Sequence, residues 1–325
     1  MSTQDGHTHM HGLKPAIPPG AKTPRGRRTD RRTPEWVTGL LFVSPWIVGF
    51  LSFMAAPILM SLYYSFTDYP LLEPPAWIGL GNYAEMFTDP LFWKTMGNTT
   101  LYAALAVPFG TILALFVAWL LNQSVKGLVF FRSAVFLPSL VPLVASSMIW
   151  LWLFNGELGL INVAIDAVLG PLGVRGPNWL GDSTWIMPAL VLMSFWSIGQ
   201  AVVIYIASLQ DVPKALYEAA DLDGMSPLTK FMNVTLPMIS PVVLFNVIMA
   251  IITSWQVFAV PYIMLGSEGG PDRAGFFYTM YLYDNAFRFQ RMGYASAMAW
   301  VQLLIILGLT GLTFLASKKL VHYRA

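Results

Sequence analysis

Six long apolar segments alternate with polar stretches along this chain. They cover about residues 36–66, 99–121, 133–154, 184–209, 238–265 and 294–317. Each is long enough to cross roughly 30 Å of hydrocarbon, which takes about 20 helical residues. None of the six contains Asp, Glu, Lys, Arg or His. The pattern predicts an all-α membrane protein in which one domain, 36–318, holds six transmembrane helices.

Composition supports this class. Hydrophobic residues make up 56% of the 325 residues and charged residues only 11%, where a soluble domain has roughly 25% charged residues. The chain has no cysteine, which excludes disulfides and thiolate metal sites.

Positive charge predicts the orientation of the chain, because loops rich in Lys and Arg stay on the cytoplasmic side. With the amino terminus inside, the inner loops and tails hold fourteen of the nineteen Lys and Arg residues. Both termini are therefore predicted to be cytoplasmic, in a bacterial or archaeal cell (inner) membrane.

The first 35 residues are predicted to be a disordered basic cytoplasmic tail, and 319–325 a short cytoplasmic C-terminus. Five arginines between residues 25 and 32 adjoin a span, which favours anionic lipid over nucleic acid as their partner. His7, His9 and His11 alternate but lack carboxylate or Cys support, so we predict no metal site and leave open what they bind.

A charged loop, about 210–237, joins the fourth and fifth apolar segments. It contains Glu218-Ala219-Ala220, then Gly224, then Val234-Thr235-Leu236-Pro237. Two alanines let a short helix press its backbone into a groove on a partner. Gly224 can take the positive φ that ends a helix, and Pro237 can start the next segment without an N–H donor. The alternative is an ordinary amphipathic cytoplasmic loop.

This spacing resembles the E-A-A-x3-G-x9-I-x-L-P signature of the membrane subunits of bacterial ATP-binding-cassette importers, with Val234 in place of Ile. The resemblance implies the MetI-like permease fold. It also implies that this loop couples the spans to an ATPase. The coupling residues that it implies are Glu218, Ala219, Ala220, Asp223, Gly224, Leu236 and Pro237.

Further motifs resemble the carbohydrate-uptake branch of these permeases, the subunit type of the larger maltose permease and the first glycerol-phosphate permease. They include Gly79-Leu80-Gly81-Asn82-Tyr83, Asp89-Pro90-Leu91-Phe92-Trp93, the stretch 132–138, Gly269-Gly270-Pro271 and Gly293-Tyr294-Ala295-Ser296-Ala297. The resemblance covers about residues 36–318. The large outer insertion and additional amino-terminal spans of the larger maltose permease are not present here.

Two outer loops carry further signals. The stretch 159–169 is apolar with Asn162 and Asp166 interspersed, which predicts a short interfacial helix. The last outer loop has an aromatic run from Phe276 to Phe287. Such a run indicates interface anchors, or contacts to a sugar or to the protein that delivers it.

The spans lack the ionisable residues that a proton- or ion-coupled transporter uses. The chain also has no G-x-x-x-x-G-K-[ST] loop and no catalytic constellation. We therefore predict a transport subunit that is not an enzyme, has no cofactor of its own, and depends on ATP-Mg bound to separate ATPase subunits.

A sugar path needs neutral hydrogen-bonding groups and aromatic faces. Trp196, Ser197 and Gln200 are predicted to share one helical face. In relatives of this family the helices flanking the coupling loop hold the sugar, which implies a path lined by Trp196, Ser197, Gln200, Asn246, Trp255, Gln256 and Phe258. The alternative is that these residues join helices to each other.

The sequence therefore predicts the permease subunit of an importer for a di- or oligosaccharide. Its predicted partners are a second homologous permease, two copies of a cytoplasmic ATPase, an extracytoplasmic sugar-binding protein and membrane lipid, with no nucleic acid. A permease for glycerol 3-phosphate or its diesters is one alternative. A structural or assembly protein of the membrane is another.

Overall fold

The structure, a computed structural model, describes residues 34–123 and 126–320. The tail predicted for residues 1–35, with His7, His9 and His11, lies outside these residues except for its last two, and so does the C-terminal segment from residue 321. The chain divides into two units, 1–55 and 56–325, which are described separately. In the first unit, helix α1 (Glu35–Phe50) leads into a π-helical turn, η1 (Leu51–Ala55).

The second unit is built from helices joined by short loops, with one two-stranded hairpin. The hairpin pairs β1 (Thr67–Asp68) with β2 (Ala76–Trp77) in antiparallel register. Its main helices are α2 (Ala56–Ser65), α3 (Gly81–Thr88), α4 (Pro90–Leu121), α5 (Leu128–Phe136), α6 (Leu143–Leu153), α7 (Leu160–Leu169), α8 (Ser183–Ser194), α9 (Gly199–Gln210), α10 (Lys214–Leu222), α11 (Pro227–Lys230), α12 (Leu236–Trp255), α13 (Ala259–Leu265), α14 (Tyr278–Tyr283) and α15 (Met292–Leu320).

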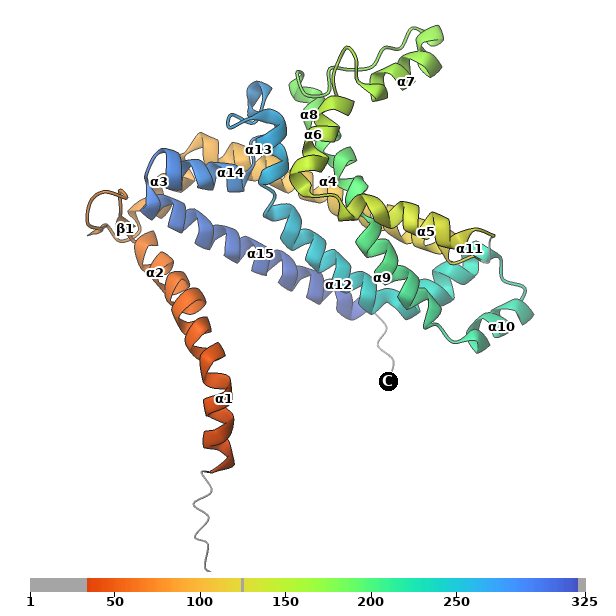
Figure 1. The fold of residues 1–325 in the computed structure, drawn as a ribbon, viewed down its shortest axis with the longest axis horizontal. Helices are drawn as coiled ribbons and strands as arrows, with labels where there is room; N and C mark the ends of the chain where they lie inside the picture. The colour runs from red at the N-terminus through yellow and green to blue at the C-terminus, as the bar shows by residue number, and fades with distance from the viewer. Residues whose placement is uncertain (1–33, 124–125, 321–325) are drawn as a thin grey trace, which may run out of the picture. The chain divides into compact units, whose positions relative to one another are not determined.

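Single turns of 3₁₀ or π helix connect several of these helices. The 3₁₀ turns are η2 (Leu137–Leu140), η3 (Gly170–Leu172), η4 (Phe195–Ser197) and η6 (Pro271–Arg273), and the π turns are η5 (Phe231–Thr235) and η7 (Asp284–Arg288). Figure 1 shows α10 beyond the end of α9, and α7 beyond the other end of the α8–α9 pair.

Four helices among the described residues are long and apolar enough to cross a membrane: Trp36–Tyr64, Pro90–Leu121, Pro227–Trp255 and Met292–Lys318. Two bent pairs, α5–η2 with α6 and α8–η4 with α9, add up to two more if each pair is one span. The predicted class, a helical membrane protein, is therefore confirmed, with four to six candidate spans.

The third and fourth predicted spans are not straight helices. The third bends by 100° between Leu140 and Leu143, and the fourth by 49° between Ser197 and Gly199. Pro138 and Pro142 lie at the sharper bend, where the missing N–H groups of proline interrupt the helical ladder. Apolar character could not predict these bends, because both halves of each span are apolar.

The boundaries of the fifth predicted span were wrong at both ends. The helix begins at Pro227 rather than at residue 238, and it ends at Trp255. The chain then breaks at Gln256–Phe258 before the separate helix α13. The predicted start was too late because Lys230 and Asn233 lower the hydropathy before residue 238. A helix can nevertheless carry polar residues where its end extends beyond the hydrocarbon.

Small residues allow α4, α9 and α12 to pack closely in the half of the second unit nearest α10. Ala114 and Ala118 of α4 are buried against Val202 and Tyr205 of α9 and Ile239 of α12. Residues four apart lie on one face of a helix, and alanines there allow helices in a membrane to approach closely. The helix α4 thus packs between α9 and α12.

Arg132 closes the end of α4 that lies near α10. Its guanidinium donates from Nε (3.3 Å) and Nη2 (3.0 Å) to the main-chain carbonyl of Leu121. Carbonyls in the last turn of a helix have no partner within the helix, and a cation near the C-terminus also complements the helix dipole. This contact gives a physical reason for the arginine in the 132–138 motif.

At its bend, the fourth span touches helix α5, the first half of the third span. A Cβ atom added to Gly199 would lie 2.6 Å from the carbonyl oxygen of Val135 and 3.0 Å from Cα of Phe136. Real Cβ atoms essentially never come that close to a main-chain oxygen. The main chain of the fourth span therefore rests directly on the main chain of the third.

The motifs of the first and last loops form two groups of hydrogen bonds. Asn82 donates to the carbonyls of Ser65 (3.0 Å) and Thr67 (2.8 Å), which fastens α3 to the end of the first span. Asp89 caps α4 through the Leu91 amide (2.8 Å) and accepts from the hydroxyls of Tyr281 (2.5 Å) and Tyr294 (3.0 Å). Burial raises the pKa of Tyr281 to about 12, so its hydroxyl remains a donor over the ordinary pH range.

The aromatic run of the last loop is mostly internal. Phe276, Phe277, Tyr278 and Tyr281 are all buried in the main apolar cluster. Asn98 of α4 holds this loop by donating to the carbonyls of Arg273 (2.8 Å) and Phe276 (2.9 Å). Both readings of the run, interface anchors or contacts to a sugar, were wrong for these four residues, which pack inside the chain instead. Phe287 remains exposed.

We predict that Gly199→Ala destabilises the protein by about 2 kcal/mol, because the added methyl group overlaps main-chain atoms of the third span that cannot move aside. The measurement is the thermal unfolding midpoint of the purified chain in lipid nanodiscs. Gly110→Ala is the matched control, since its nearest neighbour would be a Phe195 ring atom at 4.0 Å. Equal unfolding midpoints for the two variants would contradict the close contact between Gly199 and helix α5.

Candidate coupling loop and substrate path

Helix α10 ends in a Schellman turn at Gly224. The Met225 amide donates to the Ala220 carbonyl and the Gly224 amide to the Asp221 carbonyl, at 3.0 and 3.1 Å. Gly224 has φ +69°, a left-handed conformation that strains other residues. The predicted role of Gly224 in ending the helix is confirmed, and the cause is backbone conformation, since a Cβ there would meet open space.

The two alanines of the motif point in different directions. Ala220 is only 3% exposed, whereas Ala219 and the neighbouring Glu218 are exposed. The prediction that both alanines press into a partner was therefore wrong for Ala220, which is buried by its own chain. Asp223 is exposed, and so is the apolar side chain of Leu222, at 90%. The outward surface of α10 thus carries Glu218, Ala219, Leu222 and Asp223.

Two side-chain contacts fasten α10 to the start of the fifth span. The Tyr217 hydroxyl lies 3.0 Å from Oγ1 of Thr235, a buried residue in the π turn η5. Lys230 of α11 forms an ion pair with Asp221. In the predicted coupling loop, α10 is therefore fastened to α11 and η5, which form the start of one long helix.

Leu236 and Pro237 are the first two residues of α12. Pro237 was predicted to start a new segment, but the helix is continuous from Pro227, so that prediction was wrong. The π turn before it explains how proline fits: the Leu236 amide donates to Phe231, five residues back, which shifts the hydrogen-bond ladder just ahead of the residue without an N–H.

The break in the fourth span separates residues that were predicted to share a face. Trp196 and Ser197 lie in the 3₁₀ turn η4, before the bend, and Gln200 follows it in α9. Trp196 packs edge to face on Trp150, with ring centroids 5.8 Å apart. Ser197 and Gln200 are exposed. The prediction of one common face was therefore wrong, because the helix bends between these residues.

Residues of the fifth span also divide into buried and exposed groups. Trp255 is 3% exposed and packs inside the chain. Asn246 donates to the Val242 carbonyl of its own helix (3.0 Å). Gln256 is exposed at the break, and the ring of Phe258 stacks on Tyr262 at 5.1 Å. Gln256 and Phe258 thus lie on irregular backbone between two helices.

Sequence reasoning missed Gln302, which holds the end of the fifth span. This buried residue of α15 donates from Nε2 to the main-chain carbonyl of Trp255 (2.6 Å), and Thr279 also donates to that carbonyl (3.3 Å). Gln302 is a polar residue in an apolar span, and a buried amide there needs a partner. A glutamine within an otherwise apolar span was the signal by which the sequence could have revealed this residue.

Comparison with protein families identifies the class. Residues 106–322 match the family described as the binding-protein-dependent transport system inner membrane component. This match covers more than half of the chain, so the chain belongs to this family of membrane subunits of ATP-binding-cassette transporters.

Named relatives extend over nearly the whole chain. The probable ABC transporter permease protein YesP of Bacillus subtilis is 37% identical over 94% of this chain and 98% of its own. The sulfoquinovosyl glycerol transport system permease protein SmoG of Agrobacterium fabrum and the lactose transport system permease protein LacF of Rhizobium radiobacter are each 32% identical. The alignment with SmoG covers 85% of this chain and 91% of the relative, and that with LacF covers 87% and 95%.

A solved structure shares the fold. A chain of a bacterial alginate ABC transporter, crystallised with an alginate pentasaccharide-bound periplasmic protein, superposes with a TM-score of 0.76 at 20% identity. The match covers 90% of this chain and 97% of that one. This likeness confirms the predicted permease fold.

We predict that Gly224→Val frays the end of α10, because a β-branched residue at φ +69° costs about 1–2 kcal/mol or more. The measurement is amide hydrogen exchange of the peptide containing Gly224 and Met225, which should exchange about tenfold faster. Gly224→Asn is the control, since Asn tolerates the left-handed conformation. Unchanged exchange in Gly224→Val would show that the Schellman turn does not hold the helix.

Proposed function

We propose that this chain is the permease subunit of an ATP-binding-cassette importer for a di- or oligosaccharide. The loop of α10 and α11 carries the proposal, because it presents Glu218, Ala219 and Leu222 outward while it is fastened to the fifth span. The cargo class is supported by relatives named for lactose and for sulfoquinovosyl glycerol.

The energy source in this proposal is ATP-Mg bound to two copies of a separate cytoplasmic ATPase subunit. The other proposed partners are a second permease of the same fold and an extracytoplasmic binding protein that delivers the sugar. Both termini and α10 face the cytoplasm in this arrangement, in keeping with the excess of Lys and Arg in the predicted inner loops.

The sugar path proposed here runs past the breaks in the fourth and fifth spans. Irregular backbone at membrane depth is tolerated only where protein buries it or where it lines a water-filled cavity. Ser197, Gln200 and Gln256 lie at or beside the breaks, are exposed, and offer neutral hydrogen-bonding groups for hydroxyls. Trp196 and Phe258 adjoin them as aromatic faces, whereas Trp255 and Asn246 support the backbone from within the chain.

The mechanism follows from these connections. Closure of the ATPase subunits moves α10, and the contacts of Tyr217 and Asp221 carry that movement to the start of the fifth span. The bends in the third and fourth spans allow the halves of the bundle to change their angle, so that the path opens to each side in turn.

The class of cargo is tested by ATPase activity of the complex in lipid, with its binding protein, over a panel of di- and oligosaccharides plus glycerol 3-phosphate. Stimulation by one neutral sugar supports the proposal. Stimulation by glycerol 3-phosphate alone would contradict the sugar class and support a permease for glycerol 3-phosphate. No stimulation by any compound would favour a structural role in the membrane.

We predict that Glu218→Lys lowers uptake and stimulated ATPase activity by about tenfold or more, because reversing a charge at an interface costs about 2–5 kcal/mol. The affinity of the complex for its binding protein should not change. Glu157→Lys is the matched control, a charge reversal at an exposed position in the loop before α7. Normal uptake by Glu218→Lys would remove the coupling role from this residue.

A further inference from the structure

Helix α7 lies between the ends of two membrane spans. It begins shortly after α6, the second half of the third span, and the chain returns to α8, the first half of the fourth span, at Ser183. The helix is too short to cross a membrane. Its depth is nevertheless set by the two spans that it joins.

The two polar side chains of α7 are bonded to its own loop. Asn162 is 3% exposed and donates to the carbonyls of Gly156 (2.9 Å) and Pro177 (3.0 Å), while its Oδ1 accepts from the indole N–H of Trp179 (2.7 Å). Asp166 accepts from the Gly176 amide (3.0 Å). These bonds fix how the helix is rotated about its axis.

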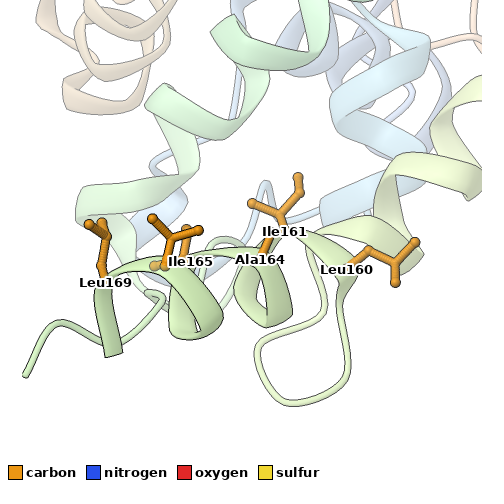
Figure 2. A pocket seen from close by; sticks show the side chains of 6 residues that line it. Leu160, Ile161, Ala164, Ile165 and Leu169 are labelled. Atoms are coloured by element: carbon orange, nitrogen blue, oxygen red, sulfur yellow. The ribbon is translucent and has the colours of Figure 1, made fainter. Parts of the chain in front are cut away.

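The rest of the surface of α7 is apolar and faces a shallow cavity of about 500 Å³. The cavity is lined only by residues of this helix: Leu160, Ile161, Ala164, Ile165, Val168 and Leu169. Val168 is 72% exposed and Leu160 is 52% exposed. In Figure 2 the labelled side chains project to one side of α7, the side on which the neighbouring helices lie.

The direction of this apolar surface identifies what covers it. The labelled apolar side chains lie on the side of the neighbouring helices, next to the ends of two spans, where acyl chains cover exposed apolar surface in a membrane. Asn162 bonds to Trp179, whose ring packs on Phe154, directly after α6, and on Trp185 of α8, so the helix is held beside these span ends. Trp152 and Trp185, exposed residues near those ends, are of the type that gathers at membrane interfaces.

We infer that α7 is a lipid anchor, with Leu160 and Val168 inserted among the acyl chains of the outer leaflet and Asn162 joining the anchor to the spans. The leaflet rests on the orientation given under the proposed function. α7 contains no Lys or Arg, so binding depends on apolar insertion and does not require anionic lipid. The anchor sets the depth of the third and fourth spans at their outer ends.

The test uses single cysteines, because the chain has none of its own. Val168→Cys and Leu160→Cys are labelled with an environment-sensitive fluorophore in the assembled complex, in nanodiscs of phosphatidylcholine. Quenching by brominated phosphatidylcholine is compared with quenching by iodide in solution. Glu157→Cys is the aqueous control, and Leu312→Cys, exposed on α15, is the control within a span.

Brominated lipid should quench the labels at residues 160 and 168 several-fold more than the label at 157, and iodide should show the reverse order. The inference would be overturned if iodide quenched the label at residue 168 as strongly as the label at residue 157. It would also be overturned if neither quencher reached residue 168, which would indicate a protein partner. A label at 312 that iodide quenches and lipid does not would overturn the membrane assignment together with the anchor.

Discussion

The structure depends on one constraint, that a main-chain carbonyl inside a membrane must have a partner. At several helix ends among the described residues, a side chain from another part of the chain bonds the free carbonyl groups. Gln302 holds the carbonyl of Trp255, Arg132 holds that of Leu121, and Asn98 holds two carbonyls of the last loop. Each of these donors comes from a different helix than its acceptor, so the breaks and the tertiary fold stabilise each other.

The same constraint connects the fold to transport. A broken span places polar groups at a depth where an unbroken helix would offer only apolar side chains. Gln200 and Gln256 are exposed next to such breaks. The long helix that ends at the second break begins at Pro227, where side-chain contacts fasten it to α10.

Sequence reasoning predicted the class, the spans that are straight, and the position and closing glycine of the α10 loop, because these depend on local patterns. It did not predict the bends of the third and fourth spans, since apolar character does not report backbone direction. It predicted that Trp196 and Gln200 share one helical face, because a helical wheel assumes an unbroken helix. It also predicted that Ala220 contacts a partner, because a helical wheel does not include neighbouring segments of the same chain. Gln302 and Tyr217 act through contacts with distant segments, which a single sequence does not display.

Gly199 has a mechanical consequence for any change of shape. Because Gly199 has no side chain, the main chain of the fourth span at its bend already touches the main chain of α5 at Val135 and Phe136, so the two cannot move closer there. Any change in the angle between these two segments must therefore keep their separation at Gly199 constant, so the contact limits them to rotation about this point.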